Sequence, residues 1–248
     1  MPDFDFVLFD ADNTLFDFDR AEHEALKGVL AAHGYPTDPA TLEVYLAVNR
    51  DLWARFDRGE VTQAYLVVER FAAFVRAMGG HDDPAQFNRD YLDRLARGAF
   101  LLPWAEALCR ALAPRCTLAI VTNGVARAQR GRFERSPLAG LISHLFISEE
   151  LGAAKPDPAF FDAVLRALGG PDRDRVLMVG DNLATDVRGG LEAGLPTAWY
   201  NPRGLPNPTP WVPAWTVESY PQLEALILGG PPPTPRPAPT APRPAPNT

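Results

Sequence analysis

Two aspartates, Asp10 and Asp12, directly follow the apolar run FVLF at residues 6–9. Four consecutive apolar residues predict a fully buried strand, so both carboxylates lie at its carboxyl end. Side chains two residues apart in an extended chain point the same way, and a cation or a shared proton relieves their repulsion. The pair therefore favours metal binding or acid–base chemistry. The alternative is a turn in which Asp12 and Asn13 only cap the next segment.

Further polar residues follow other predicted strands. Thr122 and Asn123 end the stretch TLAIVTN, Asp181 follows RVLMVG, and Asp186 comes about one helical turn later. Lys155 lies in the loop GAAKPDP, before a predicted helix. Because ligands of parallel sheets bind beyond the carboxyl ends of the strands, we expect these groups to surround one cavity.

Each of these residues also has a purely structural interpretation. Thr122 is then a strand-end residue in a turn, and Lys155 is a solvated surface lysine. Asp181 caps the following helix, and Asp186 lies on the exposed face of that helix. Their joint occurrence at successive strand ends favours the functional interpretation.

The chemistry that this set of residues indicates is phosphoryl transfer. Its reaction centre carries negative charge on oxygen, so it needs a cation and positioned donors more than a strong base. Oxygen ligands from Asp10 and Asp181, without histidine or cysteine, suit Mg²⁺, with Mn²⁺ as the alternative ion. A carboxylate nucleophile forms an acyl phosphate. Asp12 is then placed to protonate the leaving alkoxide and to activate water.

The elements that must position these residues alternate strictly after residue 103. Such alternation predicts a Rossmann-like α/β core, with a parallel sheet and helices on both faces. The first strand, at residues 6–10, has no other sheet to join and belongs to the same one. The predicted strands lie at 117–122, 144–148, 175–180 and 197–201, and the predicted helices at 104–112, 126–136, 158–169 and 184–194.

Residues 19–100 have a different pattern, with apolar residues three and four positions apart. This spacing predicts four consecutive helices inserted after the first strand, with N-caps at Thr62 and Asp83. Separate tandem domains would leave the first strand without partners. We therefore expect the core at 1–18 and 101–228, a helical insertion at 19–100, and a disordered proline-rich tail at 229–248.

Charge and cysteine content argue against several classes of partner. The net charge of −7 disfavours a nucleic acid polymer, because binding to one rests on clustered Lys and Arg. Cys109 and Cys116 have no CxxC spacing, so neither a disulfide framework nor a zinc site is indicated. The acidic and apolar first residues predict no cleavable leader, and no stretch is typical of a membrane span. We expect a cytoplasmic protein that acts on a small molecule.

Four ordered motifs carry a resemblance to a known superfamily. DADNT, VTNG, KPDP and GDNLATD resemble the motifs of the haloacid dehalogenase superfamily of aspartyl-phosphate hydrolases. The resemblance implies that Asp10 is the nucleophile and Asp12 the general acid and base. It also implies that Thr122 donates a hydrogen bond to phosphate and that Lys155 neutralises charge on the phosphoryl group and the nucleophile.

The same resemblance implies a metal site and a cap. Asp181 would bind Mg²⁺ together with the Asp10 carboxylate and the Asp12 backbone carbonyl, while Asp186 supports the metal or Lys155. The helical insertion resembles the C1-type α-helical cap of this superfamily, which is placed just after the first motif.

Longer stretches are similar to the house-cleaning pyrimidine 5'-nucleotidases, which hydrolyse nucleoside monophosphates, including modified ones. The stretches are YLAVNRDLW in the insertion and FISEELGAAKPDP, RVLMVGDN and PAWTVESYPQLEALI in the core, so the similarity covers nearly all of residues 4–228. The resemblance implies that the substrate is a nucleoside 5'-monophosphate, contacted by Thr122, Asn123 and Lys155.

Aromatic residues near the junction of core and insertion have two interpretations. Phe16, Phe18 and Trp53 either stack on the base of the leaving nucleoside or pack as apolar side chains between the two parts. The sequence does not determine the preferred base, the physiological substrate or the oligomeric state.

Three alternatives to a nucleotidase remain. A sugar phosphate or another small phosphomonoester suits the same core. A 2-haloacid dehalogenase uses the aspartate nucleophile on carbon without a metal and lacks an acid at the second position of the first motif, so Asp12 argues against it. A non-catalytic binding relative would have lost Asp10, Asp12 or Asp181, and all three are present here.

Overall fold

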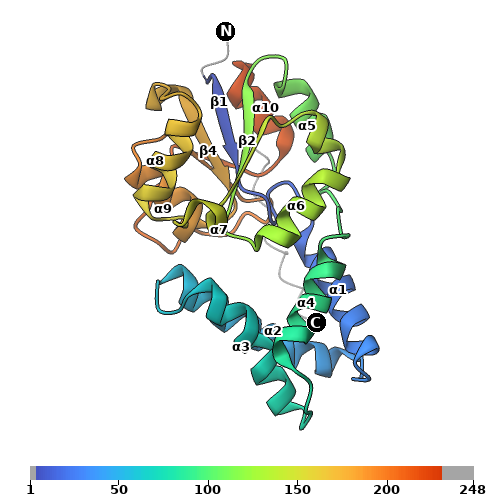
Figure 1. Ribbon diagram of the computed structural model, residues 1–248. Coiled ribbons are helices and arrows are strands. Elements are labelled where there is room, and N and C mark those ends of the chain that lie inside the picture. The colour runs from blue at the N-terminus through green and yellow to red at the C-terminus, as the bar shows by residue number, and fades with distance from the viewer. Residues whose placement is uncertain (1–3, 231–248) are drawn as a thin grey trace, which may run out of the picture.

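The core of the protein is a parallel sheet (Figure 1). The structure is a computed structural model that describes residues 4–230, and within that range the sheet has six strands in the order β3-β2-β1-β4-β5-β6. Every strand runs parallel to its neighbours. The strands are β1 (Phe6–Phe9), β2 (Thr117–Thr122), β3 (His144–Ile147), β4 (Val176–Gly180), β5 (Thr197–Tyr200) and β6 (Trp215–Val217).

Helices cover both faces of this sheet, as the alternation predicts. Val7 and Phe9 of β1 belong to a hydrophobic cluster that includes α5 (Ala105–Leu112) and α10 (Tyr220–Leu228). Leu8, between them, belongs to a second cluster with α8 (Pro158–Ala167). Successive residues of a strand point to opposite faces, so an unbroken apolar run serves both clusters. The Rossmann-like α/β class is confirmed.

The insertion after β1 consists of four helices, which share a hydrophobic cluster that also takes in Ala128 of the core. Thr62 accepts a hydrogen bond from the Tyr65 amide at 3.2 Å, and Asp83 accepts one from the Ala85 amide at 3.0 Å, so both predicted N-caps are confirmed. In Figure 1 the insertion lies below the sheet and faces the carboxyl ends of the strands. The helices are α1 (Phe18–Ala32), α2 (Pro39–Asp57), α3 (Gln63–Ala77) and α4 (Pro84–Leu95).

The remaining connections differ in detail from the periodic pattern. The third strand ends at Ile147, and Ser148 begins a short helix instead. The helix expected at 184–194 starts with a π-helical turn whose N-cap is Asn182. These connections are α6 (Ala126–Arg135), η1 (Pro137–Gly140), α7 (Ser148–Leu151), η2 (Arg173–Arg175), η3 (Leu183–Val187) and α9 (Arg188–Glu192).

Periodicity did not predict β6 and α10. Two of the three residues of β6 are exposed, so this edge strand has no apolar run, and Pro221 occupies the first turn of α10. Residues 231–248, which hold most of the expected tail, lie outside the described residues. Within residues 4–230, none of the helices has the length and apolar character needed to cross a bilayer.

Candidate active site

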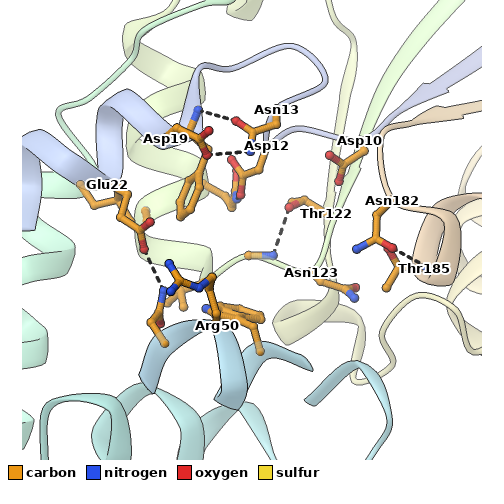
Figure 2. A pocket seen from close by; sticks show the side chains of 18 of the residues that line it. Asp10, Asp12, Asn13, Asp19, Glu22, Arg50, Thr122, Asn123, Asn182 and Thr185 are labelled. Atoms are coloured by element: carbon orange, nitrogen blue, oxygen red, sulfur yellow. Dashed lines mark hydrogen bonds between the residues drawn. The ribbon is translucent and has the colours of Figure 1, made fainter. Parts of the chain in front are cut away.

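The carboxyl ends of three central strands meet at one edge of the sheet, where a cavity of about 720 Å³ lies between core and insertion. Asp10 follows β1, Thr122 ends β2 and Asp181 follows β4. Figure 2 shows Asp10 and Thr122 on one side of this cavity and Arg50 of the insertion on the other. Phe16, one of the three aromatic candidates, is buried in the core and does not line this cavity. The other site residues predicted from the sequence all line it: Asp10, Asp12, Phe18, Trp53, Thr122, Asn123, Lys155, Asp181 and Asp186.

Lys155 lies at the centre of the polar groups, with a side chain that is 1% exposed. Its Nζ donates to Asp10 Oδ1 at 2.7 Å, to Asp186 Oδ1 at 2.7 Å and to the Val121 carbonyl at 2.8 Å. Burial by itself favours the neutral amine, but the two carboxylates outweigh it and raise the pKa of Lys155. The ammonium is therefore a fixed positive charge, and the solvated interpretation of this lysine is wrong.

Asn123 holds the backbone of Lys155 in place. Its Nδ2 donates to the Lys155 carbonyl at 2.8 Å, and its Oδ1 accepts from the Lys155 amide at 2.9 Å. This reciprocal pair ties the end of β2 to the loop that carries the lysine. Its side-chain amide thus positions the lysine, and its contact with substrate stays a prediction. Next to it, the Thr122 hydroxyl accepts from the Gly124 amide at 3.1 Å.

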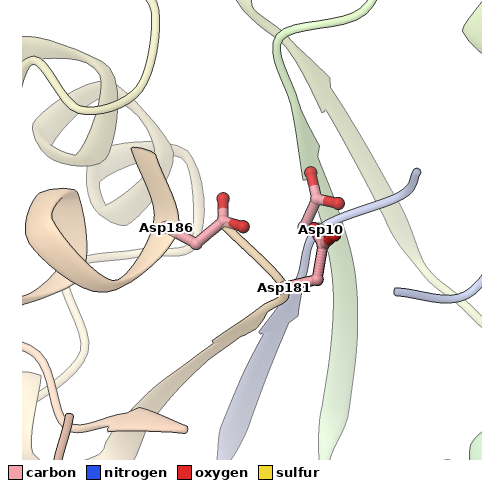
Figure 3. Close-up of side chains that lie close together, drawn as sticks. All are labelled: Asp10, Asp181 and Asp186. Atoms are coloured by element: carbon pink, nitrogen blue, oxygen red, sulfur yellow. The ribbon is translucent and has the colours of Figure 1, made fainter. Parts of the chain in front are cut away.

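Three carboxylates crowd together at the same edge. Asp10, Asp181 and Asp186 each offer an oxygen atom within 4.8 Å of the others, and Figure 3 shows their side chains around a common space. Burial raises the pKa of Asp10 to about 7, helped by Asp186 and opposed by Lys155. Burial, followed by the charges of Asp10 and Asp186, raises the pKa of Asp181 to about 8. Both shifts report the cost of bringing these negative charges together.

This donor set fits a hard divalent cation. It consists of oxygen ligands without histidine or cysteine, and a cation would offset the repulsion that raises the pKa of Asp10 and of Asp181. Asp186 has less capacity to coordinate, because its Oδ1 accepts from Lys155 and its Oδ2 accepts from the Asn182 amide at 3.1 Å. Asp10 and Asp181 are therefore the stronger ligand candidates, and Asp186 supports the lysine.

The loop after β4 is built for close approach. A Cβ atom on Gly180 would lie 2.1 Å from Asp186 Oδ2, so only glycine lets this carboxylate sit against the strand. The Asp181 amide donates to Thr14 Oγ1 at 3.1 Å, and the Asp181 carbonyl accepts from Trp199 Nε1 at 2.8 Å. These contacts hold the backbone of Asp181 while its carboxylate faces the cavity.

Asp12 is held by two residues that the sequence analysis missed. Gln129 Nε2 donates to Asp12 Oδ2 at 2.8 Å, and Arg132 Nη2 donates to Asp12 Oδ1 at 2.5 Å. Both come from α6, three residues apart, so they lie on one face of that helix. A glutamine and an arginine on a helix resemble ordinary surface residues in sequence, and only their burial distinguishes them here.

The order of these groups along the chain matches one family of enzymes. The family model of the haloacid dehalogenase-like hydrolases matches residues 4–194. The chain belongs to this family. The matched segment of the hydrolase contains the insertion, the acidic cluster, Thr122, Asn123 and Lys155.

Individual relatives of this hydrolase match across nearly its whole length. The pyrimidine 5'-nucleotidase YjjG of Escherichia coli (strain K12) is 36% identical over 223 residues, which are 90% of this chain and 97% of that protein. The pyrimidine 5'-nucleotidase PynA of Streptococcus pneumoniae is 35% identical over 219 residues, 88% of this chain and 92% of that protein. The crystal structure of the magnesium-bound HAD-hydrolase YfnB of Bacillus subtilis has a TM-score of 0.85 and 31% identity, covering 90% of this chain and 98% of that one.

The insertion of the hydrolase presents a polar wall to the cavity. Asn49 Nδ2 of α2 donates to Glu22 Oε1 of α1 at 2.8 Å. Arg70 of α3 is buried, and it donates to Asn49 Oδ1 at 3.4 Å and to Asn88 Oδ1 at 2.7 Å. The sequence analysis missed Glu22 and Arg70, because polar residues inside a helical bundle have no local signature. They give the insertion's side of the cavity both a carboxylate and a guanidinium.

Two carboxyl groups of this wall have raised pKa values. Burial raises the pKa of Glu22 to about 7, and the Arg70 charge opposes the shift. Burial, followed by the charge of Asp186, raises the pKa of Asp57 to about 6. Asp57 ends α2, so the insertion places a carboxyl group over the acidic edge of the sheet.

Two of the three predicted aromatic residues line the cavity: Phe18, where the core joins the insertion, and Trp53 of α2. Phe18 lies with its ring 5.4 Å from the guanidinium carbon of Arg132, and Trp53 packs edge-on against Phe56 at 5.6 Å. Both therefore have packing partners within the protein as well as a place in the cavity wall. Gln63 of α3 donates to the Asn123 carbonyl at 2.9 Å, which joins the insertion directly to the sheet edge.

Proposed function

We propose that this hydrolase is a Mg²⁺-dependent phosphatase that acts on nucleoside 5'-monophosphates, pyrimidine nucleotides above all, through an aspartyl-phosphate intermediate. The main support for this proposal is the length of the sequence match: the pyrimidine 5'-nucleotidase of E. coli matches 90% of this chain. The likeness therefore includes the helical insertion, which supplies one wall of the cavity. In this proposal the insertion contacts the leaving group, whereas the sheet edge contacts the phosphoryl group.

In the proposed reaction Asp10 and Asp12 have separate roles. The Asp10 carboxylate attacks phosphorus, the bond from phosphorus to the nucleoside 5' oxygen breaks, and Asp12 delivers a proton to that oxygen. In the second step Asp12 takes a proton from water, the water oxygen attacks phosphorus, and the bond to Asp10 breaks. Asp10 bonds to Lys155 only through Oδ1, which leaves Oδ2 for the attack.

The surrounding residues stabilise the negative charge of the phosphoryl group and of Asp10. Lys155 holds its proton throughout and offsets the charge of Asp10 and of the phosphoryl oxygens, while the Thr122 hydroxyl donates to one of those oxygens. When bound, Mg²⁺ supplies a Lewis acid that stabilises the charge of the transferring group, and Mn²⁺ supplies the same chemistry. The carboxylates of Asp10 and Asp181 and the backbone carbonyl of Asp12 would hold the ion, with Asp186 in support.

We further assign residues 19–100 as a cap over a core formed by 1–18 and 101–228. The cap excludes water from the phosphoryl site and encloses the leaving nucleoside. Phe18 and Trp53 are the proposed stacking partners of the base, and their competing role is apolar packing. Two free, buried cysteines, Cys109 and Cys116, fit a reducing compartment, so the proposal sets this enzyme in the cytoplasm with a small phosphomonoester as substrate.

Two rival activities use the same fold. A sugar-phosphate phosphatase shares the whole sheet edge and differs only in the leaving group, so the cap decides between it and the nucleotidase. A 2-haloacid dehalogenase would attack carbon without a metal, and Asp12 has no role in that reaction. The contacts that hold Asp12 and the acidic cluster both favour phosphoryl transfer.

The test uses the purified full chain, with Mg²⁺ and with EDTA. It measures phosphate release from a panel of nucleoside monophosphates and sugar phosphates, and halide release from a 2-haloacid. We expect the highest kcat/KM on pyrimidine 5'-monophosphates, loss of activity in EDTA and its return with Mg²⁺. Asp10→Asn should show no turnover, and Asp12→Asn should lose about 10²- to 10⁴-fold. Preference for a sugar phosphate, or activity that persists after exhaustive chelation, would overturn the proposal.

A further inference from the structure

Both oxygens of the Asp12 carboxylate are engaged by one helix. Arg132 Nη2 lies 2.5 Å from Oδ1, and Gln129 Nε2 lies 2.8 Å from Oδ2. The two donors bond different oxygens, so rotation of the carboxylate about its last side-chain bond would break at least one of these hydrogen bonds. Each oxygen keeps a second lone pair, so the contacts leave room for a proton.

Burial of the Arg132 guanidinium costs more free energy than a residue with only a packing role would need. Its side chain is 1% exposed, and Asp12 is its ion-pair partner. Its Nε and Nη1 have no hydrogen-bond partner among the described residues. The guanidinium carbon instead lies 5.4 Å from the rings of Phe16 and Phe18. A buried arginine with two unpartnered nitrogen atoms contributes little to the stability of the fold, so the contact with Asp12 points to a functional role.

The backbone around α6 makes space for this pair. A Cβ atom on Gly124 would lie 2.0 Å from Gln129 Nε2, so the glycine of the TNG motif leaves room for the glutamine amide. A Cβ atom on Gly131 would lie 2.6 Å from the Cβ of Ala96, so α6 sits tightly against the end of the insertion. The helix that carries Gln129 and Arg132 is therefore fixed against both parts of the molecule.

From these contacts we propose that Gln129 and Arg132 are positioning residues, which fix the Asp12 carboxyl group for proton transfer to the leaving oxygen. The inference rests on the proposed phosphatase function. Arg132 anchors one oxygen by charge, while the neutral Gln129 amide orients the other without adding charge. The rings of Phe16 and Phe18 cover the guanidinium, so water competes less for its hydrogen bond to Asp12.

The experiment compares two substrates that differ in their need for an acid. Uridine 5'-monophosphate leaves as an alkoxide that needs a proton, whereas 4-nitrophenyl phosphate leaves as a stable phenolate. Arg132→Met and Gln129→Leu should each lower kcat/KM on the nucleotide by about 10- to 100-fold, and on the aryl phosphate by less than about threefold. Arg130→Met, on the same helix but paired with Glu150 at the surface, is the matched control and should keep both activities.

A double-mutant cycle separates positioning from the other roles. Adding Arg132→Met to Asp12→Asn should cost nothing further on the nucleotide, because the group to be positioned is already lost. Losses that multiply, or equal losses on both substrates, would mean that Arg132 binds substrate or only supports the fold, and would overturn the inference. Thermal unfolding checks each variant, and Gln129→Leu and Arg132→Lys carry the test if Arg132→Met does not fold.

The failure of this inference is distinguishable from failure of the proposed function. If the wild type does not hydrolyse the nucleotide, the function is wrong. If the wild type does so and Asp12→Asn is impaired while Arg132→Met and Gln129→Leu are not, the positioning role alone is wrong.

Discussion

Lys155 and Asp186 form an ion pair of 2.7 Å in which each side chain is 1% exposed. The same ammonium bonds Asp10, 145 residues away in sequence, at 2.7 Å. One positive charge thus joins the end of β1 to the segment after β4, and it lies between the proposed nucleophile and its support.

Asp186→Asn should lower the free energy of unfolding by about 1–3 kcal/mol, because the buried ammonium of Lys155 loses one of its two carboxylates. Urea denaturation measures the loss. The matched control is Asp162→Asn, which removes a surface pair with Arg173 and should cost less than about 1 kcal/mol. An equal, small loss in both variants would show that Asp10 alone satisfies the lysine.

Mg²⁺ should raise the Tm of the wild type, because an ion that binds only the folded state stabilises it by mass action. Asp181→Asn should lose most of this rise, since it removes one of the two strongest ligand candidates. Asp162→Asn should keep the whole rise. The assignment of Asp181 as a ligand fails if its variant responds to Mg²⁺ as the wild type does.

Glu22 should make the stability of the protein depend on pH. Burial raises its pKa from 4.5 to about 7 in the folded protein, so between these values the folded state holds a proton that the unfolded chain releases. Stability therefore falls as the pH rises through this window. Glu22→Gln removes the effect and should gain up to about 3 kcal/mol relative to the wild type between pH 4.5 and pH 8. If the difference in free energy of unfolding between Glu22→Gln and the wild type did not change with pH across this range, the raised pKa of Glu22 would be wrong.

Phe18→Ala and Trp53→Ala test whether these two aromatic rings stack on the base. Stacking is worth about 1–3 kcal/mol, so kcat/KM on uridine 5'-monophosphate should fall by about 5- to 150-fold, with little change on 4-nitrophenyl phosphate. Trp104→Ala is the control, because this residue is 77% exposed and lies outside the cavity lining. Equal losses on both substrates would leave these rings with only a packing role.

Much of the sheet edge follows from local sequence. Each buried strand is an apolar run, and parallel strands bring their carboxyl ends together, so polar residues that follow such runs must gather at one edge. Asp10, Thr122 and Asp181 were predictable for this reason. The four helices of the insertion were predictable as well, because their apolar spacing and caps are local. Edge strand β6 was not, since its exposed residues lack any periodic pattern.

The tertiary structure alone decided which polar side chains of the helices turn inward. Gln129 and Arg132 bond Asp12 across 117 and 120 residues, and Glu22 meets Asn49 from a different helix. On a helix, a polar residue that is hydrogen-bonded to solvent has the same sequence pattern as one that is hydrogen-bonded to a side chain of another element. Its role depends on how the helix docks, and docking is set by close contacts such as that of Gly131 with Ala96. The polar edge of the sheet was therefore predictable from the strands, whereas the residues that bond Asp12 and the polar wall that the insertion presents to the cavity became visible only in the packed structure.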